Sequence, residues 1–192
     1  VSGMQYVTLH VYNDDPDEAD YDFLIKGTDG NPCTPAIQQD PPCSLVYISN
    51  VTMGTINNSS GCSGGYSNYA ATYSATAQQG ETVNFSVTNG GFHGQVIRIF
   101  GDLNADADFD DPGEQLTSLI YSNPQTAATG SFTVSASQPP GSYRLRIVSQ
   151  YAGDESAEPC LNIGGEIEDY TLVVQPAATT ITANVKLFLE GF

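Results

Sequence analysis

Residues 102–114 are the stretch of this chain whose side chains are best suited to chemistry. The stretch holds six of the 22 acidic residues, and oxygen-bearing side chains recur at every second position from Asp102 to Asp110. Alternate residues of an extended chain lie roughly 6–7 Å apart, so carboxylates at this spacing repel one another unless a cation lies among them. Ca²⁺ takes about six to eight oxygen ligands. We therefore predict a structural calcium site, with calcium as the one cofactor, whose ligands are Asp102, Asn104, Asp106, Asp108, Asp110 and Glu114.

The match to known calcium loops covers only the first half of this stretch. Asp102, Asn104 and Asp106 reproduce the D-x-N-x-D opening of such loops. Ala107 stands where the pattern has its turn glycine, and Glu114 falls one place later than the usual bidentate Glu. No amphipathic helix pattern flanks the stretch, so an EF-hand helix pair is not expected. The alternative is a solvated acidic turn in which Asp acts as a turn former.

A second acidic group, Glu166, Glu168 and Asp169, precedes the last strand pattern of the central region. Glu166 or Asp169 could complete the cation site as additional metal ligands. We favour the alternative that one of these carboxylates pairs with Arg144 or Arg146, which is a structural role if the pair is buried. A glycosidase-type pair would need a carboxyl of raised pKa in a cleft. A bound cation explains the acidity more simply, and we predict no enzymatic activity.

Tyrosines offer a different kind of site. Tyr66, Tyr69, Tyr73, Tyr121 and Tyr151 could form a face on which sugars stack, and Tyr66, Tyr69 and Tyr73 are the candidate glycan contacts. Tyrosine is also an ordinary residue of half-buried strands. Both interpretations remain open at this point.

The four cysteines predict disulfides. Cys33, Cys43, Cys62 and Cys160 show no CxxC spacing, and the two histidines are remote in sequence, so a zinc site is a poor fit. An even number of cysteines in an acidic, strand-rich chain indicates an oxidising compartment. We favour the pairs Cys33–Cys43 and Cys62–Cys160, and the alternative is free buried thiols.

Charge narrows the possible partners. The formal net charge is −17 at pH 7, with only five Lys and Arg residues. This charge repels nucleic acid and anionic membranes, so neither is an expected partner. No apolar stretch is long enough to span a membrane, so membrane insertion is not expected. An acidic protein with few lysines is suited to meeting cations outside the cell, and we predict a secreted or cell-surface location.

Short strand patterns separated by Gly and Pro turns run through most of the chain, and no window of 11 residues shows helical periodicity. In residues 81–87, for example, Val83, Phe85 and Val87 alternate with polar residues. The expected strands are 45–48, 69–73, 82–87, 95–100, 116–121, 130–134, 142–148 and 170–174, with 5–12 and 21–27 as an additional N-terminal hairpin. This spacing predicts an all-β chain forming an antiparallel β-sandwich, either jelly-roll or immunoglobulin-like.

Three stretches together carry a family resemblance. They are residues 47–62, the acidic stretch through Glu114, and residues 165–172, which begin Gly165-Glu166-Ile167-Glu168-Asp169. In this order they resemble the GEVED domain of secreted bacterial multi-domain surface proteins, with Ile in place of Val. The resemblance implies a β-sandwich accessory domain with no chemistry of its own, attached to secreted peptidases or adhesins. The family commonly has Trp before and within the acidic loop and Gly in its turn, whereas this chain has Phe100-Gly101, Leu103 and Ala107.

This resemblance divides the chain into four parts. Residues 1–28 resemble the terminal hairpin of a preceding immunoglobulin-like module, and residues 29–44 are a Pro-rich linker. Residues 45–175 form the GEVED-like sandwich. Residues 176–192 hold a linker and the first strand of a following module, similar to one found in proteins exported by type IX secretion. Both ends are therefore expected to be pieces of neighbouring modules.

The resulting functional expectation is a non-catalytic extracellular module, structural or adhesive, stabilised by calcium. One alternative is a carbohydrate-binding module of a secreted enzyme. Another is a fibre subunit in which the N-terminal hairpin and the C-terminal strand complete each other between copies by strand addition. The expected partners are neighbouring modules or copies of the same chain, and glycans in the first alternative.

Overall fold

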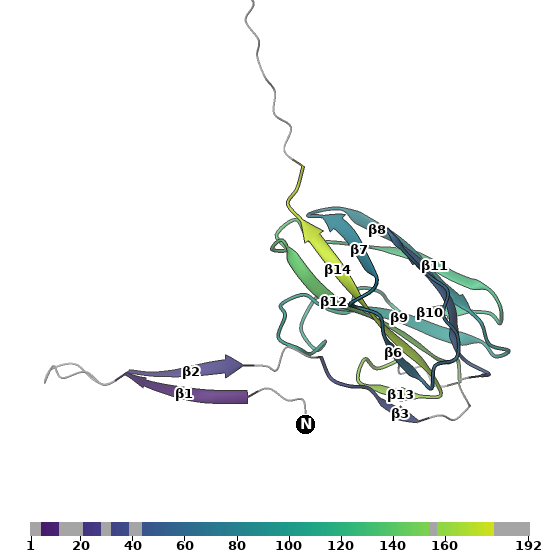
Figure 1. Cartoon of the computed structure of the whole chain (residues 1–192), viewed down its shortest axis with the longest axis horizontal. Helices are drawn as coiled ribbons and strands as arrows, with labels where there is room; N and C mark the ends of the chain where they lie inside the picture. The colour runs from purple at the N-terminus through teal and green to yellow at the C-terminus, as the bar shows by residue number, and fades with distance from the viewer. Residues whose placement is uncertain (1–4, 12–20, 28–31, 39–43, 154–156, 179–192) are drawn as a thin grey trace, which may run out of the picture.

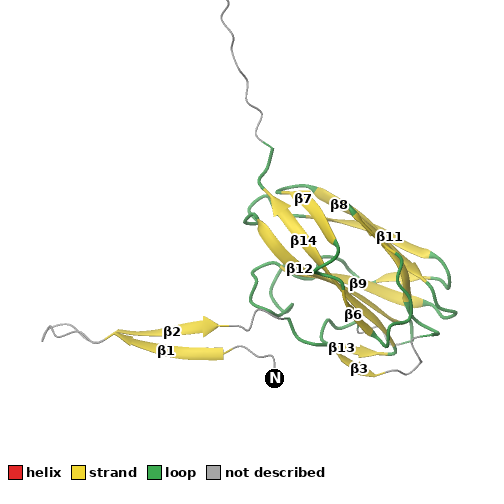
Figure 2. Ribbon diagram, viewed as in Figure 1, coloured by secondary structure: helices red, strands yellow, loops and turns green. Residues whose placement is uncertain are grey.

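The computed structural model describes residues 5–11, 21–27, 32–38, 44–153 and 157–178, and in this part of the chain every regular element is a β-strand. Figures 1 and 2 show two sheets stacked as a sandwich, with loops joining their ends and a separate hairpin to one side. The predicted all-β sandwich with an additional N-terminal hairpin is therefore confirmed. The first strand of a following module, predicted within residues 176–192, falls in residues 179–192, which lie outside the described residues.

One sheet of the sandwich has six strands. Its order is β10 (Ile120–Ser122), β9 (Gln95–Asp102), β12 (Gly141–Tyr151), β14 (Gly165–Gln175) and then β6 (Tyr66–Asn68), with β7 (Ser74–Gln78) pairing further along β14. β12 pairs antiparallel with both β9 and β14. β6 and β7 instead run parallel to β14. The expected antiparallel pairing therefore fails at this edge, because the chain enters β6 and β7 from β5 of the other sheet and so joins β14 by a crossover and not by a hairpin.

The second sheet has four strands, in the order β11 (Ala127–Thr133), β8 (Thr82–Asn89), β4 (Ile48–Met53) and β5 (Ile56–Asn58). All its pairs are antiparallel. β4 and β5 are joined by a tight turn through Gly54, whose φ of 55° lies in the left-handed region that glycine adopts without strain.

Two small sheets complete the described structure. β1 (Gln5–Val11) and β2 (Tyr21–Gly27) form the predicted hairpin. β3 (Ala36–Gln38) pairs in parallel with β13 (Leu161–Ile163). Residues 36–38 were expected in a linker, and they instead lie beside the strand that leads into β14.

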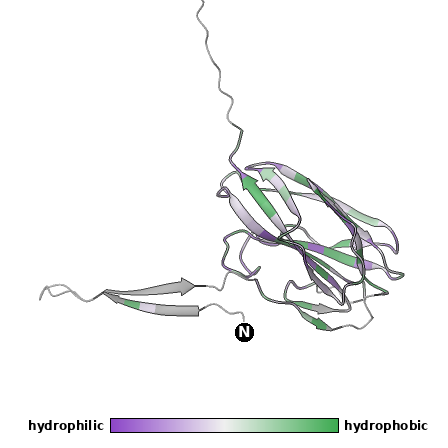
Figure 3. Cartoon of the chain, viewed as in Figure 1, coloured by the Kyte–Doolittle hydropathy of each residue, from purple (hydrophilic) through white to green (hydrophobic). Residues whose placement is uncertain are grey.

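The main core lies between the two large sheets. On β8, Val83, Phe85 and Val87 are buried while the residues between them face outward, as the alternation predicted. They meet a second set of fully buried side chains from the opposite sheet, Ile97, Ile99, Leu145, Ile147, Tyr170 and Leu172. Each such side chain contributes about 1.5–3 kcal/mol by leaving water. Figure 3 shows the apolar end of β14 that supplies part of this core.

The six-stranded sheet is also covered on its outer face. A second apolar cluster there contains Val96, Phe100, Phe109, Val148, Ala157 and Ile167. Phe109 and Ala157 come from loops, so a layer of loops rather than a third sheet covers this face. β12 and β14 are consequently buried on both faces along runs of six residues. Most of the residues that the sequence marked as chemically interesting lie in this layer.

Of the predicted strand 45–48, only Ile48 belongs to a strand, β4. Two further predicted strands are misplaced. Residues 69–73 form a turn in which the Thr72 and Tyr73 amides both donate to the Tyr69 carbonyl, and the strand β7 begins only at Ser74. Of residues 116–121, only Ile120 and Tyr121 belong to β10. In both stretches large apolar side chains pack on the core from irregular backbone, and their composition alone resembles a strand.

Candidate metal site

The acidic loop leaves the end of β9 and returns to its side. Asp102 is the last residue of β9, and the Gly101 amide donates to the Glu114 carbonyl over 2.8 Å. Phe100 and Gln115 then form an isolated antiparallel bridge. The loop is therefore closed at its base by backbone hydrogen bonds.

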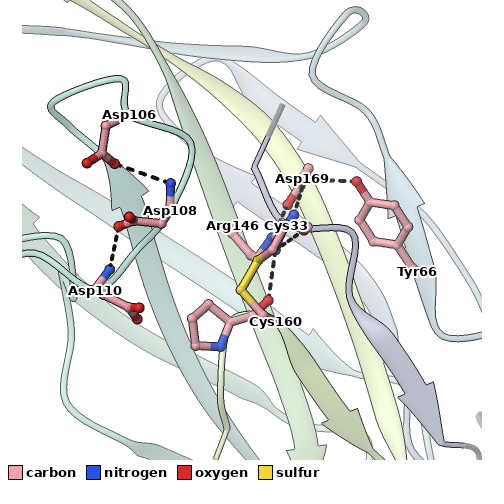
Figure 4. The surroundings of a disulfide bond; sticks show 9 residues. Cys33, Tyr66, Asp106, Asp108, Asp110, Arg146, Cys160 and Asp169 are labelled. Carbon is pink, nitrogen blue, oxygen red and sulfur yellow. Dashed lines mark hydrogen bonds and ion pairs between the residues drawn. A yellow bond between two sulfur atoms is a disulfide. The ribbon is translucent and has the colours of Figure 1, made fainter. Parts of the chain in front are cut away.

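Side-chain oxygens direct the path of the loop. The Asp106, Asp108 and Asp110 amides each donate to the side-chain oxygen two residues earlier, on Asn104, Asp106 and Asp108, at 3.0, 3.3 and 3.0 Å. Figure 4 shows the last two of these bonds. This is the hydrogen-bonding pattern of consecutive Asx turns. The alternating spacing thus has a direct backbone role besides its possible role in binding a cation.

The turns require two alanines to adopt a left-handed backbone. Ala105 has a φ of 59° and Ala107 a φ of 71°. This region costs a non-glycine residue about 1–2 kcal/mol. Ala107 occupies the position where calcium loops carry glycine. It therefore adopts the left-handed conformation of that position although it is not a glycine.

Four carboxylates converge inside the loop. Oxygens of Asp106, Asp108, Asp111 and Glu114 all lie within 4.8 Å of one another. Three of these residues were predicted ligands, and Asp111 was not, because it breaks the alternation that begins at Asp102. Asp111 is oriented by the Asn104 side-chain amide, which donates to its Oδ2 over 2.5 Å.

The other predicted ligands lie outside this group of four. Both carboxylate oxygens of Asp102 accept backbone hydrogen bonds, from Asp106 at 3.0 Å and Ala107 at 3.1 Å. Asn104 acts through Asp111, and Asp110 is exposed. Asp102 therefore caps the base of the loop.

Burial makes the negative charge of the loop costly. Glu114 is only 2% exposed, and its oxygens accept the Leu103 and Asp111 amides at 2.9 and 3.3 Å. Burial raises the pKa of Glu114 to about 7 and also raises the pKa of Asp102. A divalent cation among the carboxylates would favour their charged forms. The donor set contains only oxygen, which fits a hard cation such as Ca²⁺.

Solvent reaches this cluster through a hollow of about 540 Å³, whose lining includes Asn104, Asp111 and Glu114. A cation therefore has an entry path that does not require the sandwich to open.

The residues around Asp169 form a separate structural centre. The Arg146 guanidinium, which is fully buried, donates from Nε and Nη2 to the two oxygens of Asp169 at 2.7 and 2.8 Å. Its Nη1 donates to the carbonyls of Cys33 and Pro159. Its guanidinium carbon, Cζ, lies 4.8 Å from the centre of the Phe109 ring. Figure 4 shows Arg146 and Asp169 next to the Cys33–Cys160 disulfide.

Arg146 thus joins the acidic loop, β14 and the disulfide into one cluster. The alternative that a carboxylate pairs with Arg146 is the one the structure shows, and the carboxylate is Asp169. Neither Asp169 nor Glu166 belongs to the group of four converging carboxylates. Glu166 faces the other side of β14, where its carboxylate accepts hydrogen bonds from the Ile48 amide and from the Ser63 amide and hydroxyl.

The favoured disulfide pairing is wrong. Cys33 is bonded to Cys160 across 127 residues. Cys62 is also disulfide-bonded, and Cys43 lies outside the described residues. The expectation of a Cys33–Cys43 staple rested on nearness in sequence. Cys33 and Cys160 instead precede β3 and β13, and the parallel pairing of these two strands brings the cysteines together.

The three candidate glycan-contact tyrosines are half-buried in the fold. Tyr69 and Tyr73 pack against each other and against Tyr170. The Tyr66 hydroxyl donates to Asp169 over 2.9 Å, and its ring lies 5.8 Å from the Arg146 guanidinium carbon. They form part of the packing and not an exposed platform.

Comparison with known proteins supports one family. Residues 96–173 match the family model of the GEVED domain. The GEVED match spans most of β9 to Val173 near the end of β14, so it includes the acidic loop, Arg146 and Asp169. The predicted resemblance to this family is confirmed for these residues. The four-stranded sheet, apart from β11, lies before the matched region.

No curated protein matches the chain. Among solved structures, a Niemann-Pick type C2 protein from Japanese carpenter ant is similar, with 10% identity, 73% of this chain and 100% of that chain covered, and a TM-score of 0.39. In the described part of the chain, no helix is long and apolar enough to cross a membrane.

Proposed function

We propose that this chain is a non-catalytic structural or adhesive module of an exported surface protein, and that Ca²⁺ bound by its acidic loop stabilises it. The observation that carries the calcium site is the convergence of four carboxylates within 4.8 Å on a loop whose backbone is already closed around them. Without a cation, this arrangement places like charges together at a considerable electrostatic cost. The GEVED match and the disulfide support an exported module.

The cation would act on stability through the loop layer. Phe109 lies within the acidic loop and is 4% exposed, and its ring packs on Phe100 and on the Arg146 guanidinium. Drawing the carboxylates together keeps Phe109 in this position. A bound Ca²⁺ would therefore stabilise the outer cover of the six-stranded sheet as well as the loop itself.

The test is thermal unfolding in calcium and in excess chelator. We expect calcium to raise the melting temperature by about 5–10 °C, which corresponds to a ligand present at roughly 100 times its dissociation constant. Calorimetric titration of the chelated protein should show one calcium site. Identical melting curves in the two buffers would contradict the proposal.

Two substitutions in the same loop separate binding from general charge effects. Asp111→Asn removes one of the four converging carboxylates, while Asp110→Asn removes an equal charge outside the group. We expect Asp111→Asn to lose most of the calcium-dependent shift and Asp110→Asn to retain it. In chelator, Asp111→Asn should melt no lower than the natural sequence, because one like charge has been removed.

A further inference from the structure

The four-stranded sheet is an uncharged part of a strongly acidic chain. The formal net charge is −17, yet β4, β5, β8 and β11 contain no Asp, Glu, Lys, Arg or His residue. Six acidic residues lie instead in the loop 102–114, which covers the outer face of the other sheet. A second acidic chain therefore meets less electrostatic repulsion at the four-stranded sheet than at the acidic loop.

β11 is an open edge of this sheet. It pairs with β8 on one side, and no strand in the described part of the chain pairs with its other side. Its seven residues pair with β8 in one continuous register without a bulge. Proteins commonly protect such an edge with charged residues, proline or a bulge, or by keeping the edge strand very short. β11 has none of these protections.

The other edges of the two large sheets are shorter. β5, β6 and β10 have three residues each. β7 has five, and the turn between β4 and β5 lies against it, because the Thr55 hydroxyl donates to the Ser74 carbonyl over 2.6 Å and Gly54 lies beside Ala75. Within the described sandwich, β11 is therefore the longest edge that is left open.

The pairing with β8 determines which backbone groups of β11 are free. The Asn89 amide donates to the Thr126 carbonyl and the Val134 amide donates to the Glu81 carbonyl, each over 2.9 Å. Hydrogen-bonded pairs alternate along an antiparallel ladder, so the even-numbered residues of β11 bond to β8. The residues between them point N–H and C=O away from the sheet. These are four exposed residues, Ala127, Thr129, Ser131 and Thr133.

We propose that β11 pairs antiparallel with β11 of a second copy of this chain and joins the two four-stranded sheets into one. With a two-fold axis at Gly130, Ala127 pairs with Thr133 of the second copy and Thr129 pairs with Ser131 of the second copy. Every residue with free backbone groups then has a partner, and each pair exchanges two hydrogen bonds, about eight in all. The side chains that meet are small and uncharged, and opposed Thr and Ser can share a hydrogen bond.

A second copy suits this edge better than a flexible segment does. β11 is already an ordered strand in each copy, whereas a flexible segment loses backbone freedom at every residue that joins the sheet. The two-fold axis uses both open edges, so the assembly closes at two copies. Because pairing along one strand gives a small interface, we expect a dissociation constant of about 0.1 mM. None of the four converging carboxylates takes part, so the pairing is independent of the proposed calcium site.

The test is sedimentation equilibrium of the full chain at up to about 1 mM. We expect the mass to rise with concentration from 20.4 kDa towards twice that value. Salt at about 1 M shortens the screening length to about 3 Å and should strengthen the dimer, because it screens the repulsion between acidic copies. A mass that stays at 20.4 kDa in this salt, or that grows beyond the dimer, would overturn the proposal.

Lysine substitutions locate the contact. Thr129→Lys combined with Ser131→Lys places like charges directly opposite each other across the axis. The matched control, Thr82→Lys combined with Asn84→Lys, adds the same charge at two exposed positions of the neighbouring strand β8. We expect the β11 variant to dimerise at least about tenfold more weakly and the control to dimerise like the natural chain. Equal weakening in both would place the contact on the face of the sheet, and an unchanged β11 variant would exclude this edge.

Amide hydrogen exchange of the natural chain gives a readout that needs no substitution. The Thr129 and Ser131 amides should exchange more slowly at about 1 mM than at about 10 µM, since only the dimer protects them. The Ala128 and Phe132 amides already bond to β8 and should change much less. Slower exchange confined to another strand would assign the contact elsewhere and contradict the proposal.

Discussion

At the scale of single residues, Arg146 and Glu168 show two ways of burying a charged group. Arg146 has no solvent exposure. Its guanidinium is surrounded by partners: the Asp169 carboxylate, two backbone carbonyls and the Phe109 ring. A buried charge with this many partners is tolerated, and removing one partner would cost about 3–5 kcal/mol. Glu168, one residue before Asp169, faces the opposite side of β14 and has no basic partner within the described residues.

Glu168 is buried between the two sheets. Its Oε2 accepts the Tyr170 hydroxyl at 2.7 Å, while its Oε1 has no hydrogen-bond partner in the described structure. The Tyr170 hydroxyl in turn accepts the Asn58 side-chain amide from the other sheet. Burial raises the pKa of Glu168 from 4.5 to about 7. The folded protein therefore prefers this carboxyl in its protonated form.

The sign of the resulting pH dependence follows from the raised pKa. The stability from a protonated Glu168 is fully present below pH 4.5 and is lost as pH rises through about 7. Near pH 4.5, we expect Glu168→Gln to have a free energy of unfolding similar to that of the natural chain. Above about pH 7, we expect the free energy of unfolding of the variant to be about 3 kcal/mol higher than that of the natural chain. Urea unfolding across this range measures the difference. Glu158→Gln, at an exposed position, is the control for loss of one charge, and equal pH profiles for both variants would contradict the prediction.

At the scale of elements, the acidic loop depends on backbone conformation as much as on charge. Its Asx turns hold consecutive Asp side chains on the inside of the curve. The left-handed conformations of Ala105 and Ala107 permit this curvature. The backbone strain is stored at the site where four carboxylates meet, as is common where a ligand is bound.

Replacing Ala107 by glycine should relieve this strain. A glycine at a φ of 71° avoids the Cβ clash of alanine, so we expect Ala107→Gly to raise the unfolding free energy by up to about 1 kcal/mol and to tighten calcium binding. Calorimetry in calcium measures both quantities. Ala127→Gly, in the regular strand β11, should instead destabilise by about 0.5–1 kcal/mol. A loss of stability in Ala107→Gly would show that the loop takes another conformation in solution.

At the scale of the whole molecule, the sandwich has a third layer made of loops. The acidic loop and the Cys33 segment cover the outer face of the six-stranded sheet, and Arg146 contacts both. The Cys33–Cys160 disulfide closes 127 residues. It therefore connects the segment before the sandwich to the strand that enters β14.

Removal of this disulfide should destabilise the whole module. For a closed loop of this length, the lost restriction of the unfolded chain corresponds to about 5 kcal/mol, and measured values are commonly 2–5 kcal/mol. Urea unfolding of a Cys33→Ser, Cys160→Ser variant in calcium tests this. Substitution keeps the disulfide of Cys62 intact, which a reducing agent would not. A midpoint equal to that of the natural chain would mean that the loop layer is held without the bond.

The sequence predicted the class of fold because strand alternation is a local property. Val83, Phe85 and Val87 could be assigned to one buried face without knowledge of the opposing sheet, and the hairpin of residues 5–11 and 21–27 was equally visible. The acidic loop was visible for the same reason, since its charge density lies within 13 consecutive residues. Residues 69–73 were wrongly assigned to a strand, because half-buried tyrosines occur in a turn as well as in a strand.

Contacts between distant segments depended on the tertiary structure. The parallel pairing of β14 with β6 and β7, the Cys33–Cys160 bond and the entry of Asp111 in place of Asp110 each depend on how the chain crosses the sheet or curves in a loop. The sequence by itself therefore determined which side chains alternate and where the charge is concentrated. Only the folded chain decided which of them meet, because local spacing sets the direction of a side chain while long-range crossovers set its neighbours.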